Sequence, residues 1–316
     1  MRLILFLFGL CIGSFINVVS LRYKPEESPE TEGLYRHGAK VFDLKVLGGR
    51  SYCPHCKRQL NWYELIPVLS FMFLRGRCRT CHQKISWQYP IVEILSGLIF
   101  VFVPWRFSNS QFFNPNFSIF QSFNLSMIIL WLLIFELFLL LSIIDFRHYL
   151  IPDSINFLLL IFGIFLTILQ SFSFSIFQSS FLSHYALLFV PFSGSSGIFK
   201  FLGLLSTNIW LNHFIGLLFA AVFFGLIIFL SKGKGMGWGD FKLASALGLI
   251  FGWPDILVIL VLSFLLGGIS GIILMLSRKK HFKEAVPFGP FLVLGATLIF
   301  FFGFQIINGY FRLFSL

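Results

Sequence analysis

The sequence predicts an all-α polytopic membrane protein of about eight transmembrane helices, with a small cytoplasmic zinc-binding insertion after the first helix. Composition is the first observation behind this prediction, because 57% of the 316 residues are hydrophobic and only 12% are charged. The second is patterning: several uncharged runs approach the ~20 residues that a helix needs to cross a bilayer. The third is a pair of cysteine motifs in the one long polar segment. A single soluble core of this length would not carry such a composition.

The predicted spans follow the apolar runs in chain order. Seven runs are long, and a shorter eighth is included: 1–21, 89–105, 125–144, 154–170, 211–230, 241–253, 255–276 and 288–311. The first has only Arg2 as a basic start and no small-residue cleavage site, so we expect a retained span rather than a cleaved signal peptide. A further apolar stretch at 185–205 is interrupted by "PFSGSSG", which suits a re-entrant or loop-like segment better than a span.

The formal net charge of +11 reflects membrane topology rather than nucleic-acid binding. Twelve of the 24 Lys and Arg residues lie within 22–84, and most of the others fall in two short loops at 232–242 and 278–283. If eight spans alternate from an outside N-terminus, all three segments are cytoplasmic, as the positive-inside rule requires. The uncharged segments at 107–124 and 171–184 then lie outside. Charge confined to such loops does not form a nucleic-acid footprint.

The chain divides into three parts on this topology. Residues 1–21 form the first transmembrane helix, 22–88 a cytoplasmic loop with a four-cysteine subdomain, and 89–316 the main transmembrane domain. The first half of the cytoplasmic loop is rich in Pro and Glu and is expected to be a surface segment.

Two CxxC motifs in the second half of this loop predict a metal site. "CPHC" and "CRTC" are separated by 21 residues and supply Cys53, Cys56, Cys78 and Cys81. Two such motifs complete the tetrahedral four-thiolate shell that zinc prefers. Disulfides or plain buried thiols are the alternatives, and a reducing cytoplasm disfavours the former. We therefore expect structural Zn²⁺.

Two carboxylates lie at the ends of apolar runs. Asp145 follows the run at 125–144, and Asp240 precedes the run at 241–253, so both are expected at cytoplasmic helix ends at comparable depth. Two carboxylates a few ångströms apart cannot both ionise, so one stays protonated while its partner acts as a base. Such a pair can hydrolyse an amide bond. Asp145 and Asp240 are thus the candidate catalytic dyad.

The glycine-rich segment before Asp240 has two interpretations. Its four glycines can let a substrate peptide approach in extended form beside the carboxylate. Alternatively, they form a turn into a helix and place Asp240 near the helix N-terminus, where negative charge is favourable. Spacing alone leaves both open.

Three other acids near the spans have simpler expected roles. Asp153 is expected to cap a helix that starts near Ser154. Glu136 lies nine residues before Asp145, about 13 Å deeper on the same helix, which removes it from the dyad. Glu93, at the entry to the second span, is expected to pair with a basic loop residue or with a substrate leader. Arginines 75, 77 and 79 are expected to meet lipid phosphates or acids of their own domain.

Several long segments resemble the bacterial type IV prepilin peptidases. They are "GSFINVVSLR" at 13–22, the cysteine-rich stretch at 53–93, "DFRHYLIPD" at 145–153, "GMGWGDFKL" at 235–243 and "PFGPFLVLGA" at 287–296. They follow the order of that family and run from the first span to the last.

This resemblance implies a GxGD-type intramembrane aspartyl protease of the bacterial cytoplasmic (inner) membrane. Its substrates would be type IV prepilins or type II secretion pseudopilins, whose basic leaders it removes at the cytoplasmic face. The family's catalytic positions correspond to Asp145 and Asp240. The resemblance also implies N-methylation of the new N-terminus with S-adenosylmethionine. No glycine-rich dinucleotide-type loop in the sequence identifies a site for that cofactor.

Two other classes of function agree less well with the sequence. A proton- or cation-coupled transporter would place ionisable groups near the midplane, often in repeated halves. Only Glu136 has that depth, and the sequence shows no convincing internal repeat. A non-catalytic zinc-bearing membrane adaptor would leave the glycine-flanked Asp240 unexplained.

Overall fold

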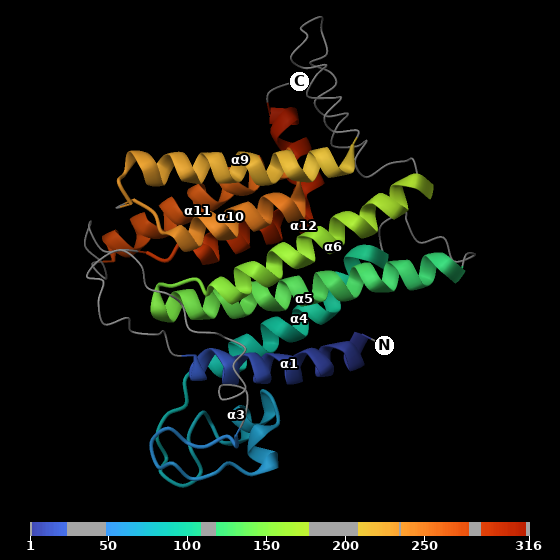
Figure 1. Ribbon diagram of the computed structural model, residues 1–316. Helices are drawn as coiled ribbons and strands as arrows, with labels where there is room; N and C mark the ends of the chain where they lie inside the picture. Colours follow the sequence, from blue (N-terminus) through green and yellow to red (C-terminus); the bar gives the residue numbers. More distant parts are fainter. Residues whose placement is uncertain are drawn as a thin grey trace, which may run out of the picture. The chain divides into compact units, whose positions relative to one another are not determined.

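The computed structural model describes residues 2–23, 49–108, 118–176, 208–233, 235–277 and 286–313. Within these ranges the regular structure is helical, and the only β-type pairings are two isolated bridges, Tyr52 with Gln59 and Arg77 with Lys84. The prediction of an all-α protein is confirmed (Figure 1).

The helices keep their labels from Figure 1. In chain order they are α1 (Arg2–Arg22), the 3₁₀ helix η1 (Trp62–Leu65), α3 (Leu69–Phe73), α4 (Gln88–Ser108), α5 (Ser118–His148), α6 (Asp153–Ile176), α9 (Ile209–Leu230), α10 (Trp238–Phe251), α11 (Asp255–Leu276) and α12 (Gly289–Leu313).

Each of the eight predicted apolar runs lies largely or wholly in a helix. By length and composition, six helices of the described chain can cross a membrane: α1, α4, α5, α6, α9 and α11. The 14-residue α10 is too short for this class, and α12 contributes the shorter apolar stretch Gly289–Gly303. The chain is therefore a multi-pass membrane protein. The interrupted stretch at 185–205 lies outside the described residues.

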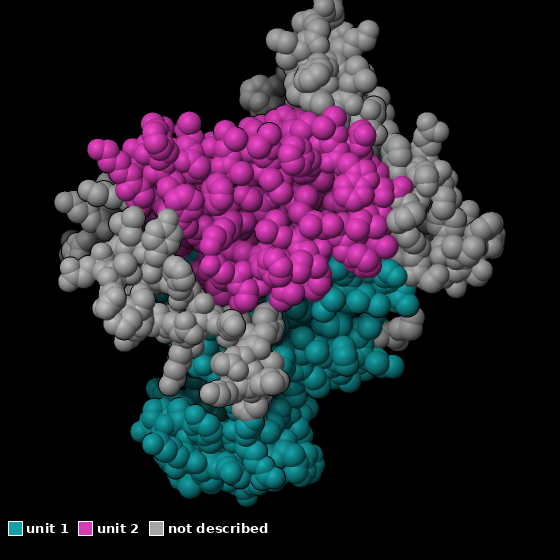
Figure 2. All heavy atoms as spheres, in the orientation of Figure 1, with its two compact units in different colours: residues 1–148 teal, residues 149–316 magenta. Residues whose placement is uncertain are grey.

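The chain forms two compact units, residues 1–148 and 149–316, which Figure 2 shows in teal and magenta. The boundaries predicted from the sequence, at 21/22 and 88/89, instead separate membrane-spanning from cytoplasmic segments. They stay a prediction.

In the first unit, α1 packs along α4, and both contact α5. Gly9 and Gly13 form a GxxxG pair on α1 that permits this close packing. A Cβ on Gly9 would lie 2.8 Å from Gly97 Cα, and one on Gly13 would lie 2.7 Å from Glu93 Cα. Larger side chains at either glycine would push the two helices apart.

In the second unit, α10 is the central helix and contacts α6, α9, α11 and α12. Its apolar residues are buried around most of its circumference, as expected for a helix enclosed by others. It packs closely against α9 where Gly216 meets Gly248. His213 of α9 joins three of these helices, since its ring nitrogens lie 2.7 Å from Leu249 O and 2.8 Å from Gln170 Oε1.

Candidate functional site

Asp145 lies near the C-terminal end of α5, three residues before the helix ends at His148. Its side chain is buried, with 4% of the residue exposed. Arg147 and His148 occupy the last turn, where positive charge is favoured by the free carbonyl groups. The first carboxylate of the predicted dyad is thus a buried acid at a basic helix end.

Asp240 lies in the first turn of α10, and the glycines before it form the start of that helix. Gly237 is the residue that precedes the helix, and its N–H donates a hydrogen bond of 3.3 Å to Asp240 Oδ2. This hydrogen bond holds the carboxylate in the first turn, where the helix dipole favours negative charge. Gly233 has φ +74°, a left-handed conformation that glycine adopts without strain. The turn-into-helix interpretation is confirmed, and the approach of an extended peptide stays a prediction.

The carboxyl group of Asp240 titrates above the ordinary range. It lies outside the six candidate spans, and its removal from water raises its pKa to about 6. The hydrogen bond from Gly237 N opposes this effect but is the smaller contribution. A carboxyl group with this pKa can hold or release a proton near neutral pH, as acid–base catalysis requires.

The "IPD" segment contacts the GxGD segment within the second unit. A Cβ on Gly239 would lie 3.0 Å from Ile151 Cβ, so a larger residue at 239 would require the two segments to move slightly apart. Lys242 Nζ lies 2.8 Å from Asp153 Oδ1. Both side chains of this ion pair are largely exposed, so it shows that the two segments lie side by side but adds little stability. Helix α6 begins at Asp153 itself.

The four cysteines of the CxxC motifs lie together. Their Sγ atoms are all within 4.8 Å of one another, and those of Cys53 and Cys81 are 3.9 Å apart. Tetrahedral zinc with Zn–S bonds of about 2.3 Å requires sulfur–sulfur separations of roughly 3.8 Å. The cluster can therefore bind a metal ion, and its geometry is consistent with zinc.

The two cysteine loops repeat the same local structure. In each, the N–H of the first cysteine donates to the carbonyl of the residue five positions later, Arg58 or Gln83. The residue after the second cysteine, Lys57 or His82, has a positive φ near 55°. An isolated antiparallel bridge closes each loop. Two equivalent loops present their thiols to one point, as a four-ligand site needs.

The backbone of the second loop stabilises a thiolate. Hydrogen bonds from the backbone N–H groups of Cys81 and Thr80 lower the pKa of the Cys78 thiol below its ordinary value. Metal ligation requires the deprotonated sulfur. The donor set and its surroundings thus fit a cation.

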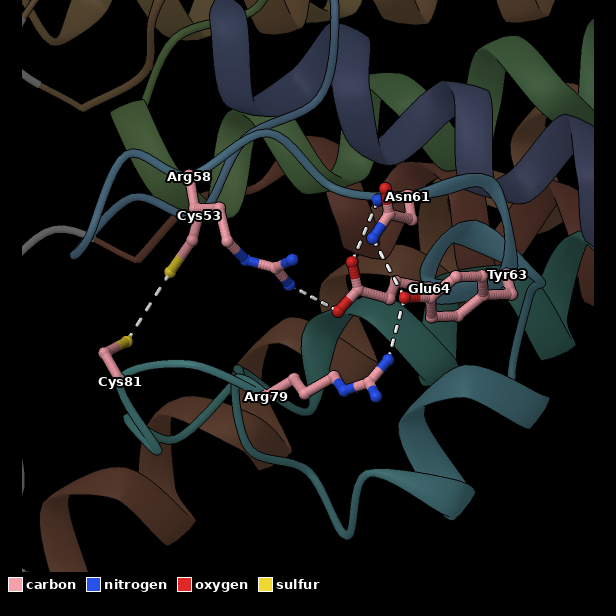
Figure 3. Close-up of polar contacts among 7 residues, drawn as sticks. All are labelled: Cys53, Arg58, Asn61, Tyr63, Glu64, Arg79 and Cys81. Atoms are coloured by element: carbon pink, nitrogen blue, oxygen red, sulfur yellow. Dashed lines mark hydrogen bonds and ion pairs between the residues drawn. The ribbon is translucent and has the colours of Figure 1, made fainter.

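Helix η1 ties the two cysteine loops together (Figure 3). Arg58 of the first loop forms an ion pair with the buried Glu64, whose other oxygen accepts the Asn61 N–H at 2.9 Å. Arg79 of the second loop donates to Tyr63 Oη at 2.7 Å. Burial disfavours the ionised form of Glu64, but Asn61 N–H and Arg58 outweigh it and hold the pKa of that carboxyl below its usual value. Arg79 therefore bonds within its own domain, to a phenol rather than an acid.

The two deeper acids have partners inside the first unit. Glu136 Oε1 lies 3.0 Å from Ser96 Oγ, whose hydroxyl also lies 2.7 Å from Gly9 O. Glu93 Oε2 accepts the Val68 N–H at 2.7 Å, and the carboxylate also bonds the Ser14 side chain. Glu93 was predicted to pair with a basic residue or a substrate leader; its described partners are instead neutral groups of its own unit.

Comparison with known families covers both the cysteine cluster and the aspartates. Residues 7–107 match the bacterial peptidase A24 N-terminal domain, and residues 128–272 match the type IV leader peptidase family. The first range contains all four clustered cysteines, and the second contains Asp145 and Asp240. The chain belongs to the type IV leader peptidase family.

Individual relatives of this peptidase family match over nearly the whole chain. A prepilin leader peptidase/N-methyltransferase of Aeromonas hydrophila is 31% identical, over 97% of this chain and 92% of the relative. The protein of the same name from Legionella pneumophila is also 31% identical, over 98% and 94%. A Bacillus subtilis (strain 168) relative with that name is 26% identical, over 98% of each chain. No solved structure matches this chain. Family membership and the spans place this peptidase in a bacterial membrane.

Sequence reasoning missed a set of buried polar residues on α1. Asn17 and Ser20 are almost completely buried, and Asn17 Nδ2 donates to Tyr89 O at 3.1 Å. Together with Ser14 they recur every three residues in an otherwise apolar helix. This spacing is the signal that could have revealed them, because polar side chains on one face of a membrane helix mark its packed face.

Proposed function

We propose that this chain is a prepilin leader peptidase/N-methyltransferase of the bacterial cytoplasmic membrane. Its substrates are type IV prepilins or type II secretion pseudopilins, and it cleaves their basic leaders at the cytoplasmic face. The relatives that match over nearly its full length carry this name. The sequence and site geometry support Asp145 and Asp240 as the catalytic residues.

The observation that carries the assignment is the contact between the "IPD" and GxGD segments. The ion pair of Lys242 with Asp153 holds the first turn of α10 beside the first turn of α6. Only residues 149–152 separate α6 from the end of α5, three residues beyond Asp145. A link of four residues is too short to cross a bilayer, which supports the proposal that Asp145 and Asp240 both belong to the cytoplasmic side.

Hydrolysis then follows from one proton shared by two acids. The ionised carboxylate takes a proton from water as the water oxygen attacks the scissile carbonyl carbon, and the protonated carboxyl donates to the carbonyl oxygen. Collapse of the tetrahedral intermediate breaks the C–N bond, and the leaving amine takes a proton from the dyad. The raised pKa of Asp240 allows its carboxyl group to hold a proton near neutral pH.

Structural Zn²⁺ is the metal proposed for Cys53, Cys56, Cys78 and Cys81. All four ligand positions are thiolates, so the ion has no open position for a substrate and serves to fold the cysteine subdomain. The methyl donor proposed for the second activity is S-adenosylmethionine. No residue is assigned to it, because the sequence has no glycine-rich loop of the dinucleotide-binding type.

The two other classes of function receive less support. A transporter relay needs an exchangeable midplane acid, whereas Glu136 is tied to Ser96 between helices. An adaptor has no need for a half-buried carboxyl group with a raised pKa at the start of a central helix.

The experiment is cleavage of a co-expressed prepilin, followed by its mobility shift. Asp145→Asn and Asp240→Asn each keep the size of the side chain but remove the ionisable carboxyl, so we expect loss of cleavage by at least about 10²-fold. Asp153→Asn is the matched control, because it makes the same change in an exposed ion pair of the same motif. It should retain most activity. Membrane insertion and metal content verify folding, and normal cleavage by an inserted Asp240→Asn protein would refute the mechanism.

A further inference from the structure

The segment 66–74 of the cysteine subdomain has the composition of a membrane element. Its sequence, IPVLSFMFL, contains one serine and eight apolar residues. Leu69, Met72 and Phe73 share the spacing of one helix face, and all three are exposed, Met72 by 66% and Phe73 by 83%. A soluble loop would not leave such a face in water.

Hydrogen bonds place this segment at the depth of the transmembrane helices. Helix α1 has 21 residues, or about 31 Å, and carries Arg2 and Arg22 at its two ends, so it matches the ~30 Å hydrocarbon core. Ser14 lies eight residues, about 12 Å, inside the Arg22 end. Its side chain bonds Glu93, which in turn accepts the Val68 N–H at 2.7 Å. Val68 therefore lies well below the charged end of α1.

An aromatic contact fixes the segment from its other face. The Phe71 ring lies against Trp87, next to the start of α4, with centroids 5.0 Å apart. In the view of Figure 1, α3 is drawn within the length of α1 rather than beyond its end. Phe71 thus faces the protein, while Leu69, Met72 and Phe73 point away from it.

Five backbone N–H groups of the segment donate to acceptors within the protein. Pro67 has no N–H, and Val68 donates to Glu93. Further donors find acceptors within the segment: Leu69 to Pro67 O, Ser70 to Ile66 O, Met72 to Val68 O and Leu74 to Ser70 O. Backbone groups in contact with lipid must form their hydrogen bonds within the protein, because the bilayer core contains no water to replace them.

We propose that residues 66–74 form an interfacial membrane element that anchors the cysteine subdomain in the cytoplasmic leaflet. Leu69, Met72 and Phe73 lie among the acyl chains, and the exposed Arg75 and Arg77 directly after the segment lie at the level of anionic lipid phosphates. The subdomain is therefore held against the bilayer rather than suspended in the cytoplasm. Lipid is favoured over a substrate leader as the occupant, because the leader is basic and the flanking arginines would repel it.

A matched position for comparison lies in the first cysteine loop. Arg22, at the charged end of α1, donates to the carbonyls of Gly49 and Arg50 at 3.3 and 3.2 Å. Tyr52, two residues later, is therefore held near the level of that end. It is also an exposed aromatic residue.

The test uses the full chain with the photoreactive residue p-benzoylphenylalanine at Phe73 or at Tyr52. Each protein is reconstituted in vesicles of phosphatidylethanolamine and phosphatidylglycerol and irradiated, and adducts are identified by mass spectrometry, with metal content as the folding control. We expect acyl-chain adducts at position 73 several-fold above those at 52. Equal lipid adducts at the two positions, or transfer of the position 73 adduct to an added prepilin, would overturn the proposal.

A second measurement introduces a negative charge into the segment and follows its accessibility to trypsin. In inverted membrane vesicles, with the cytoplasmic face outward, Phe73→Glu should release the segment and speed tryptic cleavage after Arg75 and Arg77 several-fold. Tyr52→Glu should leave that rate unchanged. The same rate in Phe73→Glu and in the unmodified protein would contradict insertion.

Discussion

Glu136 and Ser96 lie 3.0 Å apart, carboxyl oxygen to hydroxyl oxygen, between α5 and α4. The same hydroxyl lies 2.7 Å from Gly9 O on α1. A hydroxyl has one proton and a carbonyl can only accept, so the two contacts are simultaneous hydrogen bonds when Glu136 carries a proton. Glu136 is then a neutral acid that joins three helices.

Glu136→Gln should leave stability close to that of the unmodified protein, because the amide can still donate to Ser96. Glu136→Ala should cost about 1–2 kcal/mol, since interhelical hydrogen bonds in membranes are worth up to roughly that amount. Thermal unfolding in detergent measures both. An infrared band of a protonated carboxyl group, lost in Glu136→Gln, is the direct signature. Equal destabilisation by Gln and Ala would exclude the donor role.

The metal prediction concerns the cysteine cluster. Purified protein should contain about one equivalent of zinc, and Cys56→Ser should lose it and loosen the subdomain, because the site needs all four thiolates. Elemental analysis and protease resistance report the two effects. Cys11→Ser is the matched control, since Cys11 lies on α1, outside the cluster. A metal-free preparation with full activity and an intact subdomain would contradict the prediction.

The pH prediction concerns Asp240. The folded state holds its proton up to pH about 6, above the ordinary value near 3.8. Native protein therefore binds more protons than unfolded protein between these values, and stability falls as pH rises through that window. The full pKa difference corresponds to about 3 kcal/mol in the free energy of unfolding, and solvent screening reduces this contribution.

Asp240→Asn should therefore be more stable than the unmodified protein above pH 7, by about 1–2 kcal/mol, and equal to it below pH 4. Unfolding midpoints across pH give the comparison. Cleavage by the unmodified enzyme should decline at both pH extremes, with apparent pKa values that belong to the aspartate pair. A stability difference that does not change with pH would disprove the assignment to Asp240.

The topology prediction concerns three loops. A cysteine introduced at Lys232 or Lys280 should react with an impermeant maleimide only from the cytoplasmic side, and one at Ser179 only from outside. Lys280 and Ser179 lie beyond the described residues, so the expectation for them comes from charge alone. The parent protein gives the background labelling of its native cysteines. Cytoplasmic labelling at Ser179 would require a different number of spans.

Local patterns in the sequence predicted much of the molecule. The apolar runs became helices because length and hydropathy decide membrane insertion, and the CxxC spacing brought four thiols together because each short loop aims its own pair. Asp240 could likewise be placed at a helix end because it directly precedes the apolar run at 241–253, whereas the glycines before it left two interpretations open.

Contacts between distant segments could not be predicted in the same way. Nothing in the sequence around Glu93 identifies Val68 N–H as its partner, since a backbone group has no signature in side-chain patterns. The pairing of Lys242 with Asp153 joins positions 89 residues apart. Residues 66–74 fall within the loop 22–88, which the sequence assigned as a whole to the cytoplasm from its basic residues.

The short length of helix α10 has a consequence for how water reaches the enzyme in the membrane. Its 14 residues extend about 21 Å, some 9 Å less than the hydrocarbon thickness. Because α10 is enclosed by four longer helices, its shortfall leaves room for a hydrated recess at one helix end. Asp240 occupies the first turn, so the shortfall gives water a route to the bond that it must split. Leader cleavage should accordingly slow in bilayers of longer acyl chains, which makes membrane thickness a variable of the reaction.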